Sequence, residues 1–380
     1  MTAPIFILAG EASGDQLAAH LMCAVNTAYN NPEWIGVGGR LMQKAGLDPS
    51  SRDFNELSVM GFGSAVSAYP RLSRLADKLV DEVMAARPRL ILTVDNKGFA
   101  IRFAGRLKRR MKAAGWSAPI IHCVAPTVWA WGVWRAKKFA TIMDGLLCLF
   151  PFEPDYFTPL GLDAHFIGHP EAFSDFLPIK QVVKSKNSAP RIILLPGSRH
   201  SEITLILPEM LVAAAIIKTH EPAAEFVLPA VPNLLPLIRD FTAGRAITVL
   251  DQPQDLIPAL QTSDAMIAAS GTVTLQAALC GTVGVTCYRT GRISGFIGRR
   301  LVDFDKVILP NAILGRPLYP FYFQEAVTGK NLATAVLDCL VDDKAKARGR
   351  EAAIELKHRL TSDHDHFDEM VIRALKNWLG

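Results

Sequence analysis

Residues suited to phosphate chemistry follow two short apolar runs of this sequence. Gly197-Ser198-Arg199 comes after the aliphatic run 192–195 and a proline, and Ser270-Gly271-Thr272 comes after the run 264–268. The guanidinium of Arg199 is planar and permanently charged, and its geometry matches phosphate oxygens. A strand–turn–helix connection also presents backbone N–H groups and the positive end of a helix dipole to an anion. The two segments therefore predict an anion site, with ordinary strand-to-helix turns capped by hydroxyls as the alternative.

Two acidic residues occupy comparable places nearer the N-terminus. Glu11 lies in the small-residue turn 9–15, after the apolar run 5–8, and Asp95 directly follows the apolar run 90–94. A carboxylate beside a substrate hydroxyl is a candidate general base, whereas the same residue at a helix N-cap would be structural. Ser13 and Gly14, in the same turn as Glu11, are small enough to let a ligand approach the backbone. Both interpretations of Asp95 stay open at this point.

Apolar and aromatic side chains of the segments 59–75 and 128–134 are candidates for contact with an acyl chain or a membrane. The residues concerned are Met60, Phe62, Val66, Trp129 and Trp131. Such side chains either pack in the protein core or present an amphipathic surface to lipid, and the sequence does not choose between the two.

The charge balance is basic, with 41 Lys and Arg against 36 Asp and Glu and a formal net charge of +5. This excess permits an acidic partner, such as a nucleotide, a phospholipid surface or nucleic acid, without selecting one of them. The densest basic run, 106–112, is typical of the last turn of a helix, where cations complement the helix dipole. Attraction to an anionic lipid surface is the alternative interpretation of this run.

No motif of the sequence indicates a metal or a cofactor. The 6 cysteines are scattered without Cys-x-x-Cys spacing, which argues against a zinc site and a disulfide framework and favours a reducing cytoplasm. His364-Asp365-His366 lies in a polar segment near the C-terminus and is not expected to bind a metal, and no other His/Asp cluster indicates a divalent cation. The start of the chain lacks the basic region of a signal peptide, and Gly, Thr and Ser interrupt the apolar stretch 265–287 as in a buried core.

The elements that position these residues are apolar runs alternating with helical patterns. This alternation predicts an α/β fold with parallel, doubly wound sheets, and 380 residues are enough for two domains. We expect an N-terminal domain over residues 1–175, a linker over 176–190, a second domain over 191–345 and C-terminal helices over 346–380. In such pairs of domains, ligands bind at the carboxyl ends of the strands, in the cleft between the halves.

Short motifs spread over most of the chain carry a resemblance to a known family. In chain order they are AGEASGD at 9–15, GVGG at 36–39, VMG at 59–61, VWAW at 128–131, FPFE at 150–153, FIGHP at 166–170, LLPGSR at 194–199, ASGT at 269–272 and LPN at 309–311. With these motifs the sequence resembles the lipid-A-disaccharide synthases, the family-19 glycosyltransferases of Gram-negative bacteria. So many ordered matches are more specific than any single glycine-rich turn.

The resemblance implies a GT-B architecture, in which two Rossmann-like domains face a cleft. It implies transfer of 2,3-diacylglucosamine from its UDP derivative onto 2,3-diacylglucosamine 1-phosphate (lipid X), giving the β(1→6) disaccharide and UDP. It further implies peripheral attachment to the cytoplasmic face of the inner membrane and no nucleic-acid partner, and it leaves room for an oligomer. Carried over by position, it assigns UDP binding to Gly197, Ser198, Arg199, Ser270, Gly271, Thr272, Gln276 and Asn311. It assigns the general base to Asp95, with Glu11 as a second candidate.

The chain departs from the family pattern beside Asp95. Lys97, Gly98 and Ala100 replace the Pro, the second Asp and the Asn of the family's Asp-x-Pro-Asp-Phe-Asn segment. The missing carboxylate weakens a mechanism with two acids and leaves the proposal with Asp95 or Glu11. Gln276 stands where the family usually has Glu, and its amide still accepts a hydrogen bond from a ribose hydroxyl, without charge.

Two other functions fit the same sequence features. One is a different two-Rossmann UDP-sugar enzyme, such as a UDP-N-acetylglucosamine 2-epimerase or the glycosyltransferase of peptidoglycan lipid II. The other is a membrane-peripheral protein that binds a nucleotide sugar or a lipid without turnover, which the altered segment 95–100 favours. The product distinguishes these two functions from that of a lipid-A-disaccharide synthase, because only the synthase yields UDP and an acylated disaccharide.

Overall fold

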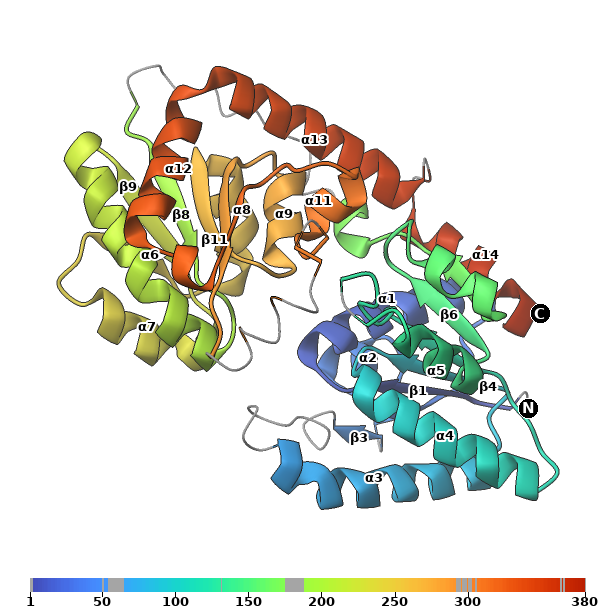
Figure 1. The fold of residues 1–380 in the computed structure, drawn as a ribbon. Helices are drawn as coiled ribbons and strands as arrows, with labels where there is room; N and C mark the ends of the chain where they lie inside the picture. Colours follow the sequence, from blue (N-terminus) through green and yellow to red (C-terminus); the bar gives the residue numbers. More distant parts are fainter. Residues whose placement is uncertain are drawn as a thin grey trace. The chain divides into compact units, whose positions relative to one another are not determined.

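The computed structural model describes residues 3–49, 51–53, 65–130, 132–174, 188–291, 295, 299, 303–304, 306–362, 364 and 366–379, with the side chains of 53, 65–69 and 253 left aside (Figure 1). The chain divides into two compact units. The first comprises Met1–Phe173 together with Leu360–Gly380, and the second comprises Ser174–Arg359. Each unit contains one sheet, and all strand pairs of the described residues are parallel.

The first unit is built on a sheet with the strand order β3-β2-β1-β4-β5-β6-β7. Its strands are β1 Ile5–Ala9, β2 Trp34–Gly38, β3 Arg52–Asp53, β4 Leu90–Val94, β5 Ile120–Cys123, β6 Gly145–Cys148 and β7 Asp163–Phe166. Its helices are α1 Ala12–Ala28, α2 Arg40–Lys44, α3 Ala65–Ala86, α4 Lys97–Ala113, α5 Arg135–Ile142 and α14 Phe367–Leu379, with 3₁₀ turns η3 Pro154–Tyr156, η4 Thr158–Leu160 and η5 Pro170–Phe173. The strand order reverses between β1 and β4, which places the switch point of the sheet there.

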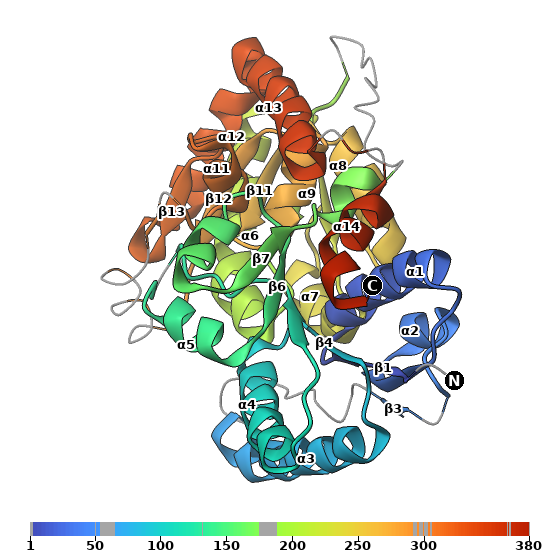
Figure 2. The same cartoon turned by 90° about the vertical axis from the view of Figure 1, so that its right-hand side faces the viewer.

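Helices cover both faces of this sheet, because its strands are apolar on both sides. Ile5 and Ile7 of β1 pack into a cluster with α1 and α14, whereas Phe6 and Leu8 pack into a second cluster with α3, α4 and α5. Successive strand side chains alternate between faces, so a fully buried strand needs a layer of helices on each side. Figure 2 shows α14 beside α1 in this arrangement.

The second unit repeats the plan with the strand order β10-β9-β8-β11-β12-β13. Its strands are β8 Arg191–Leu195, β9 Glu225–Pro229, β10 Ile247–Leu250, β11 Ala265–Ala269, β12 Gly284–Tyr288 and β13 Phe321–Phe323. Its helices are α6 His200–His220, α7 Leu235–Thr242, α8 Leu256–Thr262, α9 Val273–Leu279, α11 Leu309–Leu314, α12 Gly329–Val341 and α13 Asp343–Thr361, with 3₁₀ turns η6 Pro232–Leu234, η7 Pro253–Asp255 and η8 Gln324–Ala326. Its switch point lies between β8 and β11. Two doubly wound α/β units with a helical C-terminus therefore confirm the predicted fold class.

Helix α6 is long and apolar enough, by length and composition, to cross a membrane, but half of its most apolar window is buried within the protein. It packs against α12 and contributes Ile203, Ile206 and Met210 to the core of the second unit. These contacts explain its composition as that of a core helix.

The last helix, α14, belongs to the first unit although it ends the chain. Phe367, Val371 and Leu375 lie on its buried face and join the cluster formed by α1 and β1. The indole of Trp378 packs edge-on against His165 of β7, at 5.5 Å between ring centroids. Arg89 also donates a hydrogen bond to the carbonyl of Leu379 at 3.3 Å. Burial of this apolar face is the physical reason for the return of the chain to its first sheet.

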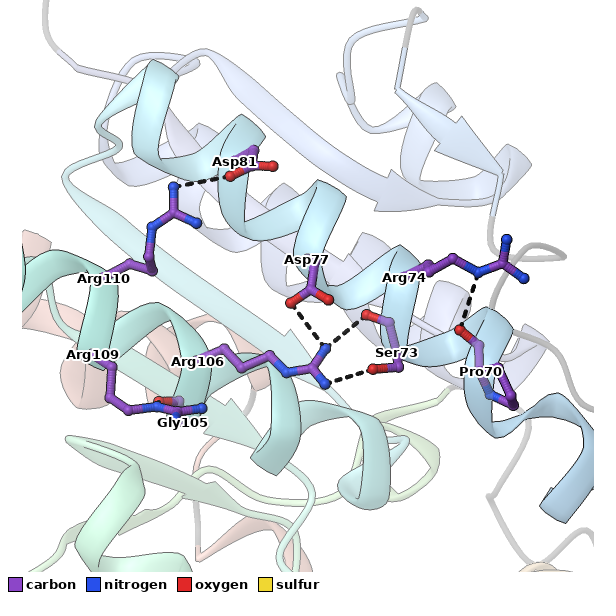
Figure 3. Close-up of polar contacts among 9 residues, drawn as sticks. All are labelled: Pro70, Ser73, Arg74, Asp77, Asp81, Gly105, Arg106, Arg109 and Arg110. Carbon is purple, nitrogen blue, oxygen red and sulfur yellow. Dashed lines mark hydrogen bonds and ion pairs between the residues drawn. The ribbon is translucent and has the colours of Figure 1, made fainter.

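Most charges of the basic run 106–112 are paired with neighbouring carboxylates. Figure 3 shows Arg106 of α4 reaching Asp77 and Ser73 of α3, and Arg110 reaching Asp81. Lys108 contacts Asp144 at 2.7 Å. These contacts favour the interpretation of the run as a solvated helix end that fastens α4 to its neighbours, over that of a lipid-binding surface.

Candidate functional site

Asp95 lies at the switch point of the first sheet in an unusual backbone conformation. Both Asp95 and Asn96 have positive φ values, 53° and 41°, which non-glycine residues rarely adopt. The N-cap position of α4 belongs to Asn96, so Asp95 does not cap this helix. Its side chain is 28% exposed, and its Oδ1 lies 3.7 Å from Nζ of Lys97. The capping alternative raised by the sequence does not apply, and Asp95 is accessible to a ligand.

Two glycines allow the turn after β1 to approach Asp95 and Asn96. A Cβ on Gly10 would lie 2.5 Å from Nδ2 of Asn96, and one on Gly14 would lie 3.8 Å from Cβ of Asp95. Glu11 is exposed at the N-cap of α1, and Ser13 is exposed in the first turn of the same helix. The structure thus brings Glu11, Ser13, Gly14 and Asp95 to one edge of the first sheet.

Asp15 in the same motif has a structural task that the sequence did not reveal. Its buried carboxylate accepts hydrogen bonds from the backbone N–H groups of Gly39 at 2.7 Å, Leu41 at 3.1 Å and Met42 at 3.2 Å. These donors are the orphan amides at the start of α2, which a carboxylate satisfies well. The acidic residue at the end of the glycine-containing turn therefore fastens α2 to α1.

Beneath Asp95 lies a group of buried polar side chains. Nδ1 of His122 lies 2.7 Å from the hydroxyl of Thr93, and burial, together with the Lys97 ammonium, lowers the pKa of His122 to about 3. Glu153 accepts hydrogen bonds from the N–H groups of Leu149 at 2.9 Å and Phe150 at 3.0 Å. Burial raises the pKa of Glu153 to about 8, although these two donors and Lys97 oppose the shift. At neutral pH this layer is therefore largely uncharged.

The predicted lipid-contact residues separate into different environments. Trp129 is buried and packs edge-on against Phe150 at 6.0 Å and Phe152 at 5.1 Å between ring centroids. The most exposed tryptophan of the described residues is Trp134, in the same predicted segment 128–134, with 76% of its surface accessible. The remaining candidates cannot be placed in this way: Met60, Phe62 and Trp131 lie outside the described residues, as does the side chain of Val66 in α3.

A pocket of about 360 Å³ opens at the switch point of the second sheet. Residues from two turns and from helix α9 line it together, namely Gly197, Ser198, Arg199, Ser270, Gly271, Thr272 and Gln276. Its far wall is formed by the segment Pro229–Pro232 with Gln252 and Leu256. Thr272 is the N-cap of α9, yet its side chain makes no capping hydrogen bond, so the hydroxyl remains usable by a ligand. The size lies within the range of about 300–1,000 Å³ of small-molecule sites.

The sequence suggested that the backbone amides after β8 face an anion in this pocket. In the structure these amides donate to a side chain of the protein instead. Oε2 of the buried Glu202 accepts hydrogen bonds from the N–H groups of Ser198 at 2.9 Å and Arg199 at 3.1 Å. Oε1 of the same side chain lies 2.9 Å from Nη1 of Arg199. The spacing of Glu202, three residues after the helix N-cap, is the signal that could have predicted this contact.

Asn311 does not line the pocket. Its amide oxygen accepts hydrogen bonds from the N–H groups of Leu318 at 2.8 Å and Tyr319 at 3.1 Å, and its Nδ2 donates to the carbonyl of Tyr319 at 3.1 Å. These bonds hold the turn after α11, so a contact of Asn311 with UDP stays a prediction. Within the described part of the chain, no group of three or more His, Cys, Asp or Glu side chains is arranged to hold a metal ion.

Comparison with known proteins decides which family has this arrangement. A family model described as lipid-A-disaccharide synthetase matches residues 5–371. The chain belongs to this family. A lipid-A-disaccharide synthase of Rhodospirillum centenum is 36% identical over 361 residues, covering 93% of this chain and 88% of that protein. One of Burkholderia vietnamiensis is 34% identical over 387 residues, covering 98% and 97%.

Membership of the lipid-A-disaccharide synthetase family makes the chain a glycosyltransferase of lipid A biosynthesis, as the resemblance implied.

Solved structures share the fold at low identity. A structure of S. aureus MnaA with UDP has a TM-score of 0.65 and 11% identity, covering 100% of this chain and 97% of that one. The calicheamicin glycosyltransferase CalG4 has a TM-score of 0.59 and 13% identity, covering 100% and 98%. A UDP-GlcNAc 2-epimerase from Neisseria meningitidis has a TM-score of 0.59 and 11% identity, covering 98% and 100%. Epimerases and glycosyltransferases therefore share this GT-B type of fold, and sequence rather than fold separates them here.

Replacement of Glu153 by Gln should change how stability depends on pH. Because the folded-state pKa of about 8 lies above the ordinary value of 4.5, Glu153 contributes stability that is complete below pH 4.5 and is lost as the pH rises through 8. Relative to Glu153→Gln, the wild type should lose about 1.4 kcal/mol of unfolding free energy per pH unit between about pH 5 and pH 8.

Urea unfolding followed by tryptophan fluorescence measures this effect, because all 6 tryptophans of the sequence fall within the ranges of the first unit. Asp155→Asn, at an exposed carboxylate in the adjacent η3, is the matched control and should parallel the wild type. Parallel profiles for wild type and Glu153→Gln would show that the buried carboxyl group does not titrate in this range.

Proposed function

We propose that the chain joins UDP-2,3-diacylglucosamine to lipid X, with UDP in the pocket of the second unit and the acceptor hydroxyl at Asp95. The observation that carries this assignment is the meeting of UDP-assigned residues from two separate turns and from helix α9 around one pocket, which Arg199 also lines. The reaction class comes from the family, and the lining of the pocket supports this location for UDP.

The proposed mechanism is a single inverting displacement. Asp95 accepts the proton of the 6-hydroxyl of lipid X while that oxygen attacks the anomeric carbon of the donor. The bond between this carbon and the diphosphate oxygen breaks, and its electron pair leaves with UDP. Arg199 and the exposed turn Gly271-Thr272 stabilise the negative charge that develops on the leaving group. Glu11, exposed at the neighbouring strand end, is the second candidate for the base.

Lys97 gives this chain an acceptor site that differs from the family pattern. Its ammonium lies 3.7 Å from the Asp95 carboxylate, in the segment that lacks the family's second Asp and Asn. A cation beside the base supplies charge complementarity for an anionic acceptor, whereas a second carboxylate would repel it. The proposed proton transfer then uses Asp95 as a lone carboxylate with a cationic neighbour.

We further propose that the enzyme works at the cytoplasmic face of the inner membrane and meets lipid through the start of α5. Val133 and Trp134 are 57% and 76% exposed there, and Lys137 and Lys138 are exposed on the first turn of the helix. A tryptophan next to lysines suits the boundary between anionic headgroups and acyl chains. Because both substrates carry acyl chains, such contact would place Asp95 near its lipid acceptor.

Replacement of Asp95 by Ala should lower kcat by about 10²–10⁴, the usual contribution of a general base. The measurement is formation of the tetraacyl disaccharide from UDP-diacylglucosamine and lipid X, with mass spectrometry of the lipids. Asp155→Ala, at an exposed carboxylate of the same unit, serves as the control and should retain activity. A kcat of Asp95→Ala within a factor of about two of the wild type would exclude Asp95 as the base and direct attention to Glu11.

Replacement of Arg199 by Ala should weaken UDP binding by about 10- to 100-fold, because a charge-assisted hydrogen bond contributes about 1.5–3 kcal/mol. Isothermal titration calorimetry with UDP measures the affinity directly. Arg348→Ala is the matched control. Arg348 is an exposed arginine of the same unit and pairs with Asp342, which lies between α12 and α13. Unchanged affinity of Arg199→Ala would count against the placement of the diphosphate.

Replacement of Trp134 by Glu should reduce flotation with anionic liposomes by about tenfold, because a buried aromatic side chain contributes about 1.5–3 kcal/mol and a carboxylate is repelled. Val341→Glu is the control, at an exposed apolar residue of the second unit with 78% of its surface accessible. Equal flotation of the two variants would remove the start of α5 from the lipid contact and leave the segment 59–75 as the candidate.

A further inference from the structure

Glu202 is a largely buried carboxylate among the residues that line the proposed diphosphate pocket. It lies in the first turn of α6, and its side chain is 7% exposed, whereas that of Arg199 is 67% exposed. Burial of a charged group costs several kcal/mol unless polar partners compensate it. The position of a negative charge next to a site for an anion therefore needs a physical reason.

The partners of Glu202 show what it holds in place. Oε2 accepts hydrogen bonds from the N–H groups of Ser198 and Arg199 at 2.9 and 3.1 Å. Oε1 contacts Nη1 of Arg199 at 2.9 Å and accepts a hydrogen bond from the hydroxyl of Tyr288 at 3.4 Å. Both oxygens thus have two partners, and three of the four contacts concern the segment that carries Arg199.

Gly197 confirms that the turn is built around this carboxylate. Its φ value is +110°, and a Cβ at this position would lie 2.3 Å from Oε2 of Glu202. The glycine of the Pro-Gly-Ser-Arg motif therefore makes room for the Glu202 side chain. Because the Ser198 and Arg199 amides already have an acceptor, the contribution of this turn to an anion in the pocket falls to the Arg199 side chain.

We propose that Glu202 is a positioning residue, which holds the guanidinium of Arg199 by one nitrogen so that its outer N–H groups face the pocket. Burial acts against the charged form of Arg199, but the Glu202 carboxylate and, to a smaller extent, Tyr288 together raise the pKa of Arg199. A guanidinium fixed before binding loses less side-chain entropy when it contacts a diphosphate. This inference rests on the proposed placement of UDP in the pocket of the second unit.

Glu202→Gln distinguishes positioning from simple charge. Removal of a negative charge near the site should tighten UDP binding if only Coulomb repulsion matters. Under the positioning role it should weaken UDP binding by about tenfold, because the Gln amide cannot accept from both the amides and the guanidinium. The Michaelis constant for UDP-diacylglucosamine should rise in parallel, while that for lipid X should stay within a factor of about two.

Calorimetry with UDP on four proteins tests the coupling: wild type, Glu202→Gln, Arg199→Ala and the double variant. If Glu202 acts through Arg199, its replacement causes no further weakening once Arg199 is absent, so the two effects are not additive. Tighter or unchanged UDP binding by Glu202→Gln, or additive losses in the double variant, would overturn the inference.

The same titrations separate a failure of this inference from a failure of the proposed function. If the wild type does not bind UDP, or if Arg199→Ala binds it as the wild type does, the proposed placement of UDP fails independently of Glu202. If Arg199→Ala alone weakens binding, the placement stands and only the role of Glu202 is wrong.

Glu209→Gln is the matched control for a lost carboxylate on the same helix. Glu209 of α6 accepts a hydrogen bond from the N–H group of Gly329 at 2.8 Å and contacts Arg289 at 3.3 Å, and it does not line the pocket. Its replacement should leave the UDP affinity unchanged. If Glu202→Gln does not fold, Glu202→Asp carries the test, since its side chain is one methylene shorter and cannot reach both the backbone amides and the guanidinium. A dissociation constant raised about threefold supports the inference, and an unchanged or lower one overturns it.

Discussion

Parallel strands buried on both faces leave polar side chains few positions, and this constraint governs both units. The strands β1, β4 and β11 are buried along their whole length, so the first residues free to carry polar groups are those that follow them. Glu11, Asp95 and Ser270 occupy such positions. Because strand order reverses between β1 and β4 and between β8 and β11, the connecting helices diverge there and leave each strand end accessible. Candidate chemistry is therefore confined to the switch points.

Several carboxylates near the strand ends accept hydrogen bonds from the backbone and are thereby occupied within the protein. Asp15, Glu153 and Glu202 are buried, and each accepts hydrogen bonds from at least two backbone N–H groups. A buried charge or proton acceptor of this kind is stable only with such donors, which makes the side chain an anchor for a turn. Asp95 differs because its partly exposed side chain contacts a lysine instead. This contrast in partners distinguishes a candidate base from structural acids of the same residue type.

Aromatic and basic residues show the same dependence on their neighbours. Trp129 and Trp134 are five positions apart in a segment that reads as amphipathic, yet one is in a cluster of rings and the other is exposed. Arg106 and Arg110, within the most basic run of the chain, contact carboxylates of α3. The proposed lipid contact therefore rests on exposed apolar and cationic side chains that lie together at the start of α5, because composition alone is a poor guide.

The sequence by itself determined the alternation of strands and helices, the doubly wound class and the residues at the strand ends, because apolar periodicity and glycine-containing turns are local properties. Its motifs also determined the family. Tertiary structure decided what those residues do: which amides after β8 remain for a ligand, that Asn311 holds a turn, and that α14 packs on the first sheet. These outcomes depend on partners distant in sequence or on the rotamer of one nearby side chain. Hydrogen bonds and burial depend on which groups meet in space, and apart from the capping-box spacing of Glu202 the sequence spacing does not specify these groups.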